Sequence, residues 1–258
     1  MGIDDVVVTR TIFNRFCKEF EDCFDVDVAI AGAGPAGLIA AKYLAEAGKK
    51  VVVFERKLSV GGGMWGGGMT FPVVVVQDRS KSLLEDVDVK LRKEDDGYFS
   101  ANSIECVNKL CASAIDEGAS FFNNMSVEDV LLERDKVNGF VINWSSVEVA
   151  GLHVDPLTIR AKYCIDATGH PAEICNIVRA KIRPEEGALS IEKSLVERSM
   201  SADQGEQAVV DNTREVYPGL FVAGMCANAV FSSHRMGPIF GGMLLSGKKA
   251  AEKILEKI

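Results

Sequence analysis

The chain has 258 residues, of which 37 are acidic and 29 are basic, so its formal net charge is −8 at pH 7. This length suits one large domain or two small ones, and the acidic balance argues against a nucleic-acid surface, which normally shows a basic patch. No stretch reaches the ~18 apolar residues of a membrane helix, and the acidic start MGIDDVVVTR is unlike a secretory signal. We therefore expect a cytoplasmic protein that acts on small molecules, with neither a nucleic acid nor a membrane as a partner.

The seven cysteines include no Cys-x-x-Cys pair. In a chain without a signal peptide, we expect them to be reduced and mostly buried. Zinc-finger and thioredoxin-like sites are therefore not predicted.

The first element predicted is an amphipathic helix over residues 9–24, because Phe13, Phe16 and Phe20 recur at helical spacing. We expect residues 1–24 to form a helical arm that leads into a single α/β domain spanning residues 1–258.

Residues 26–56 predict a buried strand, a glycine-rich turn, a helix ended by Gly48 and a second strand. The turn carries Gly-x-Gly-x-x-Gly, and an acidic residue ends the second strand 18 positions after the last glycine. This arrangement is typical of a dinucleotide-binding βαβ unit, in which the glycines let the backbone approach a pyrophosphate at the helix N-terminus. The acidic residue can accept hydrogen bonds from ribose hydroxyls and would repel a 2′-phosphate. The residues are Gly32, Gly34, Gly37 and Glu55.

Residues 59–71, SVGGGMWGGGMTF, contain two Gly-Gly-Gly clusters, whose backbone can approach a ligand closely. Met64, Trp65, Met69 and Phe71 are interleaved with the glycines, and we do not expect them to stay exposed. We interpret the segment as a ligand-lining loop rather than a flexible surface loop.

Residues 102–118 predict a helix from their apolar spacing. Residues 127–144 alternate in polarity and predict a small antiparallel β-meander that turns at 135–138. We place this meander in an inserted unit at 126–150.

Residues 161–170, AKYCIDATGH, predict a further buried strand. The polar stretch 183–212 predicts a mobile surface loop of the kind that closes over sites. After the segment 217–230, YPGLFVAGMCANAV, the chain predicts a terminal helix from about Pro238.

The order of these elements resembles that of the two-dinucleotide-binding-domain flavoproteins. The resemblance implies a Rossmann-type α/β fold with a parallel central sheet and a small antiparallel β-meander. Flavoproteins of this kind carry an acidic residue, which holds the ribityl chain, where this chain has Met225 after Ala223 and Gly224. Met225 therefore argues against a flavin in a flavoprotein-like fold.

Six motifs narrow the resemblance further: AGAGPAG, ERK, GGGMWGGGM, LHVDP, DATGH and SHRMGPIFGGMLLSG. Together they are similar to those of the thiamine thiazole synthase family. That likeness implies an enzyme of the pentosyltransferase class that takes NAD as a substrate and releases nicotinamide. The ADP-ribose remainder would condense with glycine and sulfide to an adenylated thiazole carboxylate for thiamine biosynthesis.

His153 stands where the eukaryotic form of that family has a cysteine that gives up its own sulfur. The resemblance therefore implies the prokaryotic, sulfide-dependent form, which uses ferrous iron and turns over repeatedly.

Three residues are candidates for metal chemistry. His153 and Asp155 point to the same face of an extended segment, and His170 follows a strand at the edge where α/β folds place their chemistry. Imidazole and carboxylate ligands suit ferrous iron. By resemblance, Asp155 and His170 match iron ligands from neighbouring protomers of a homo-oligomer, which we expect to be an octamer. A His-Asp-His triad is the alternative ligand set, and we predict that His153, Asp155 and His170 are all catalytic.

The same matching predicts the remaining site residues. Arg235 corresponds to a glycine-binding arginine, whose guanidinium can hold a carboxylate bidentately. Besides the glycines of the turn, the residues matched to the NAD or product pocket are Ala36, Glu55, Arg56, Gly63, Val127, His153, Val154, Asp155 and Met225.

Three other functions stay open from the sequence. They are an FAD-dependent oxidoreductase, an isomerase acting on a ribose bisphosphate, and a non-enzymatic module that binds NAD or stores iron.

Overall fold

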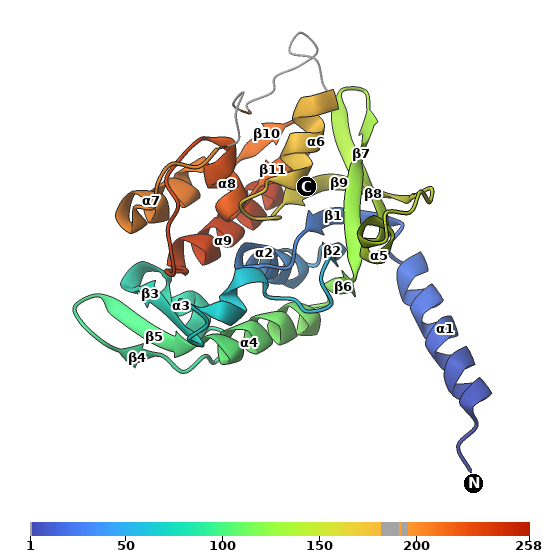
Figure 1. The fold of residues 1–258 in the computed structure, drawn as a ribbon, viewed down its shortest axis with the longest axis horizontal. Coiled ribbons are helices and arrows are strands. Elements are labelled where there is room, and N and C mark those ends of the chain that lie inside the picture. Colours follow the sequence, from blue (N-terminus) through green and yellow to red (C-terminus); the bar gives the residue numbers. More distant parts are fainter. Residues whose placement is uncertain (1, 182–190, 192–195) are drawn as a thin grey trace.

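The structure, a computed structural model, describes residues 2–181, 191 and 196–258. A central sheet is covered by helices on both faces, and helix α1 (Asp5–Glu21) extends away from the body of the protein (Figure 1). None of the helices in the described part of the chain has the length and apolar character that crossing a bilayer requires.

The central sheet has a mostly parallel core. Its strand order is β10-β11-β9-β1-β2-β6, and every neighbouring pair from β11 to β6 is parallel. Strands β1 and β2 are nearly continuous apolar runs because helices cover them on both faces. This confirms the predicted α/β fold. The strands are β10 (Glu215–Tyr217), β11 (Leu220–Val222), β9 (Leu157–Asp166), β1 (Asp25–Ala31), β2 (Val51–Glu55) and β6 (Ser120–Asn123).

The strand register brings several strand ends to one edge of the sheet. Asp166, the last residue of β9, pairs with Ala31 of β1 and with Val222 of β11. Ala31 also pairs with Phe54 of β2. Because these strands are parallel, the loops that follow them emerge side by side, which is where α/β sheets bind their ligands.

An antiparallel meander extends the sheet, as predicted. Strand β7 (Met125–Glu133) pairs with β8 (Lys136–Trp144), and β8 pairs with the first half of β9. The turn lies at Arg134 and Asp135, which have positive φ angles of 52° and 57°. Two such residues make the tight turn that suits a twisted hairpin, so the turn comes slightly earlier than the expected 135–138.

Two hydrophobic cores lie on the opposite faces of the sheet. In β1, Val28 and Ile30 face the helices α2 (Pro35–Glu46), α4 (Ser103–Asp116) and α9 (Gly241–Leu255). Ala29 and Ala31 face the second core, with the meander, α6 (Glu173–Lys181) and α8 (Met225–Val230). This is the two-residue alternation of a strand, and it fixes which helices flank the loops at the sheet edge.

A second, three-stranded antiparallel sheet was not predicted. It has the order β3-β5-β4 and packs beside α3 (Asp78–Glu85). The short strands give little periodic pattern, although Val74 and Val76 alternate into the core. The strands are β3 (Val73–Gln77), β5 (Tyr98–Asn102) and β4 (Arg92–Lys93).

Some predicted boundaries are corrected. Helix α1 starts at Asp5 rather than residue 9, because Asp4 Oδ1 accepts hydrogen bonds from the backbone N–H groups of Val6 and Val7. The expected mobile loop at 183–212 is wrong for its last part, which forms helix α7 (Ala202–Asn212). Residues 183–190 and 192–195 of that stretch lie outside the described residues.

Helices α2 and α9 approach so closely that only glycine fits at one contact. A Cβ atom on Gly247 of α9 would lie 2.3 Å from the carbonyl oxygen of Ala36 in α2. The same helix α2 begins at the glycine turn, so this packing also sets the position of the turn.

We predict that Gly247→Ala destabilises the protein. The better helix propensity of alanine would stabilise α9 by ~0.5–1 kcal/mol, but the forced separation from α2 should cost about 1–3 kcal/mol. The measurement is the midpoint of denaturant unfolding, with Glu252→Ala on the solvent side of α9 as the control. An unchanged midpoint would show that the two helices separate without cost.

Candidate functional site

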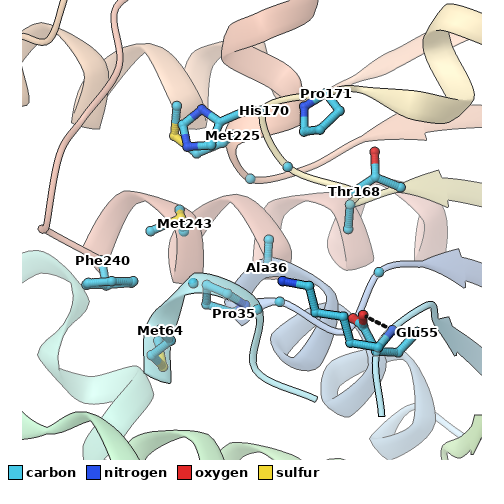
Figure 2. A pocket seen from close by; sticks show the side chains of 18 of the residues that line it. Pro35, Ala36, Glu55, Met64, Thr168, His170, Pro171, Met225, Phe240 and Met243 are labelled. Atoms are coloured by element: carbon cyan, nitrogen blue, oxygen red, sulfur yellow. Dashed lines mark hydrogen bonds between the residues drawn. The ribbon is translucent and has the colours of Figure 1, made fainter. Parts of the chain in front are cut away.

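A cleft of about 850 Å³ opens at the edge where the parallel strands end (Figure 2). Its walls come from the glycine turn after β1, the loop at 59–71, the meander, the loop after β9 and the segment 235–243. The site is thus assembled from loops far apart in the sequence.

The glycine turn is shaped by contact with β9. Gly32 has φ +98°, and a Cβ atom there would lie 2.5 Å from the carbonyl oxygen of Ala167. Gly34 instead has open space where a Cβ atom would be, and it lies at the N-terminus of α2, with Pro35 as the first helical residue. The N-terminal end of α2 is therefore accessible to an anionic group such as a pyrophosphate.

Glu55 is buried at the end of β2 and lines the cleft. Its Oε2 accepts a hydrogen bond of 2.9 Å from the backbone N–H of Ala33, and its Oε1 accepts one of 2.9 Å from that of Lys57. Figure 2 shows Glu55 among the side chains that line the cleft, with a dashed line for a hydrogen bond of its carboxylate. Each oxygen keeps a lone pair, so the carboxylate can also accept hydrogen bonds from sugar hydroxyls.

Arg56 forms an ion pair with a residue that was not predicted. Its Nη1 donates to Oε1 of Glu173, at the start of α6, and both residues line the cleft. Burial raises the pKa of the Glu173 carboxyl, and Arg56 opposes that rise. The sequence signal for Glu173 is its place in the first turn of the helix that follows the Ala-Thr-Gly-His motif.

Residues of the loop at 59–71 line the cleft, but only half of the loop's large side chains are sheltered. Met64 is fully buried, and the indole N–H of Trp65 donates to the carbonyl of Val60. Met69 and Phe71 are 87% and 68% exposed. The prediction that all four would leave solvent is therefore wrong for these two, which lie where the cleft meets solvent.

Methionines form much of the apolar wall. Six of the chain's eight methionines line the cleft, and Figure 2 shows three of them, Met64, Met225 and Met243. Methionine side chains are flexible and polarisable. They can therefore adapt their conformation to the molecule that the cleft binds.

His170 lies in the loop after β9 and lines the cleft. Its Nδ1 is 2.6 Å from Oε2 of Glu197, a second residue that was not predicted. Nothing periodic in the sequence around 197 marks it. The pair holds an imidazole at the cleft wall, where a metal ion could bind.

The segment with the other metal candidates lies elsewhere. His153, Val154 and Asp155 are exposed, and within the described residues they do not line the cleft. Their neighbours Val149 and Leu152 are 87% and 62% exposed. Within one copy of the chain, Asp155 is therefore not among the described residues that line the cleft with His170.

Most of the other predicted residues do come together. Gly37 lies beneath the turn, where a Cβ atom would be 2.1 Å from the carbonyl oxygen of Gly32. The predicted residues that line the cleft are Gly32, Gly34, Ala36, Glu55, Arg56, Gly63, Val127, His170, Met225 and Arg235.

A buried cluster of Asp166, Cys175 and Cys226 has metal-ligating side chains within 4.8 Å of one another. Both carboxylate oxygens are already engaged: Oδ1 accepts from the N–H and hydroxyl of Thr168, and Oδ2 from the N–H of Cys175. Burial raises the pKa of Cys175 to about 11 and that of Cys226 well above its usual value. Without a bound metal ion the thiols therefore stay protonated, and the hydrogen bonds that Asp166 accepts fix the loop that carries His170.

Comparisons with known proteins agree in family. The Thi4 family matches residues 9–240. The chain is 52% identical over 260 residues to the thiamine thiazole synthase of Methanothermobacter thermautotrophicus, covering 100% of both chains. It is 47% identical over 256 residues to that of Pyrococcus furiosus, covering 99% of each. The crystal structure of Thermovibrio ammonificans THI4 superposes with a TM-score of 0.94 at 42% identity, over 100% of this chain and 99% of that one.

The pKa shifts predict which cysteines react in the native protein. Burial raises the pKa of Cys106 to about 12 and that of Cys175 to about 11, so little thiolate forms at about pH 8. We expect DTNB to label the exposed Cys17 quickly and these two only after unfolding, when all seven cysteines should react. Rapid labelling of Cys175 in the folded protein would contradict its burial.

Proposed function

The chain belongs to the Thi4 family of thiamine thiazole synthases, enzymes of thiamine biosynthesis, and from that membership we propose the reaction. It joins NAD, glycine and sulfide into an adenylated thiazole carboxylate and releases nicotinamide, with ferrous iron in the site. The observation that carries the proposal is one cleft that holds a dinucleotide-binding turn, an imidazole and an arginine.

The ADP half of NAD fits the part of the cleft around the glycine turn. The N-terminus of α2 faces the pyrophosphate, and Glu55 accepts hydrogen bonds from the ribose hydroxyls of the adenosine. Its carboxylate would repel a 2′-phosphate, so NAD is favoured over NADP. Arg56 and Val127, which also line the cleft, contact the phosphates and the adenine.

The nicotinamide ribose and glycine fit the part with His170 and Arg235. Water displaces nicotinamide, and the resulting ribose opens, isomerises to a ketone and condenses with the amine of glycine with release of water. The guanidinium of Arg235 holds the glycine carboxylate through two parallel hydrogen bonds, which orients the amine. The methionine wall adjusts as the substrate changes shape and keeps water from the intermediates.

His170 and Asp155 are the ligands we assign to ferrous iron. The ligand set of imidazole and carboxylate fits that ion. The Nδ1 atom of His170 is already bonded to Glu197, so Nε2 is the ring nitrogen available to the metal. When bound, iron supplies a Lewis acid and a template for sulfide and substrate. His153, two residues before Asp155, has an imidazole that can accept and release protons, and we assign it proton transfer beside the metal.

Asp155 must reach this cleft from another copy of the chain. The segment around it is exposed and apolar, with Val149, Leu152 and Val154 all open to solvent, as at surfaces that become interfaces. Helix α1, all of whose residues the structure describes, likewise has no buried side chain. We therefore propose a homo-oligomer, an octamer, in which neighbours share each iron site.

The residue at 153 decides the source of sulfur. A histidine has no sulfur to donate, so sulfide comes from solution and the protein turns over repeatedly. An FAD-dependent oxidoreductase is the weaker alternative, because Met225 lines the cleft and offers no carboxylate to a ribityl chain.

We predict that anaerobic incubation with NAD, glycine, sulfide and ferrous iron yields an adenylated thiazole in excess of the protein. Mass spectrometry of the products, quantified against the protein concentration, is the measurement. Omitting sulfide should stop the reaction. Product that stays at or below one molecule per chain would contradict repeated turnover, and no thiazole at all would overturn the reaction.

A complementation experiment tests the shared site. Asp155→Asn and His170→Asn should each be inactive, but co-expressed chains should regain activity, because some clefts then combine an intact His170 with an intact Asp155 from a neighbour. The control pair is His170→Asn with Arg235→Gln. Both residues line the cleft of one chain, so mixing should restore nothing. Equal behaviour of the two pairs would exclude a shared site.

A further inference from the structure

We propose that Glu197 is a positioning residue for His170, which fixes the ring and its tautomer so that Nε2 is presented to the metal. The inference rests on the proposed function, since it concerns the ligand set assigned there. It adds a residue that the family motifs of the sequence do not include.

The geometry places Glu197 behind the imidazole. Its Oε2 is 2.6 Å from the Nδ1 of His170, and its side chain is 10% exposed against 49% for the histidine. His170 lines the cleft, whereas Glu197 does not. A carboxylate can only accept a hydrogen bond, so Nδ1 carries the proton and the lone pair of Nε2 is left for a ligand. Metal-binding histidines are commonly held in this way.

The second oxygen of Glu197 is an independent observation. Oε1 is buried and has no hydrogen-bond partner among the residues that the structure describes. A buried carboxylate with one hydrogen bond is unfavourable unless a positive charge is close by. A cation bound to His170 supplies that positive charge. If the pair of Glu197 and His170 were only a structural contact at the surface, no such charge would be needed.

A short backbone ladder holds Glu197 in place. The N–H of Arg198 donates to the carbonyl of Ser233 at 2.9 Å, and the N–H of Arg235 donates to the carbonyl of Arg198 at 3.3 Å. The N–H of Ser201 donates to the carbonyl of Arg235 at 2.9 Å. The segment that carries Glu197 is therefore bonded to the segment that carries the glycine-binding arginine, and a change in the Glu197 side chain leaves these bonds intact.

The experiment is a titration of the full-length protein with Co(II), followed by visible absorption, for wild type, Glu197→Gln and Glu197→Leu. The leucine variant should bind Co(II) about 10–100-fold more weakly than wild type. The glutamine variant should fall between them, because its amide oxygen still accepts from Nδ1. Glu133→Gln, at a surface ion pair with Arg160, is the matched control and should bind as wild type does.

Circular dichroism and gel filtration should show that all variants keep the fold and the assembly, so that a loss of binding reports on the site. Wild-type affinity in the leucine variant would overturn the positioning role alone. Absence of Co(II) binding in the wild type would overturn the proposed metal site, and the inference with it.

Discussion

The close contact between the glycine turn and the end of β9 governs this structure. Gly32 adopts φ +98° with Ala167 directly against it, and Gly37 packs on the carbonyl of Gly32. Gly247 then brings α9 against α2 at the same place. Because these contacts involve backbone atoms, they leave the turn little conformational freedom. They therefore fix the position of the N-terminus of α2 relative to the edge of the sheet. The glycine turn and the start of α2, which form one wall of the cleft, take their position from these contacts.

Three polar side chains of the cleft are held in place before any ligand binds. Glu55 is fixed by two backbone N–H groups, Arg56 by Glu173, and His170 by Glu197. Such preorganisation reduces the reordering that binding and catalysis would otherwise require. Between these groups the apolar wall includes six methionines, whose flexible side chains can adapt to ligands of different shape. The cleft thus combines fixed polar groups with a compliant apolar lining.

Local sequence patterns predicted the helices and strands whose structure depends mainly on residues close together in the chain. The run before Gly32, the helix after it and the acidic end of β2 each follow from short-range periodicity and glycine spacing. Sequence patterns did not predict the exposure of a side chain where its burial depends on residues far away in the sequence. Met69 and Phe71 looked as apolar as Met64, but only Met64 meets the core. The second sheet was missed because its short strands carry too little alternation.

By itself, the sequence determined the α/β fold, the glycine-rich turn, the acidic end of β2 and the family, because these depend on residue type at fixed spacing along the chain. Only the tertiary structure decided that Glu173 and Glu197 stand behind Arg56 and His170, since those pairs join segments 117 and 27 residues apart. It also showed that Asp155 lies outside the cleft of its own chain. Whether two side chains meet depends on the packing of whole elements, and spacing along the chain does not specify that packing.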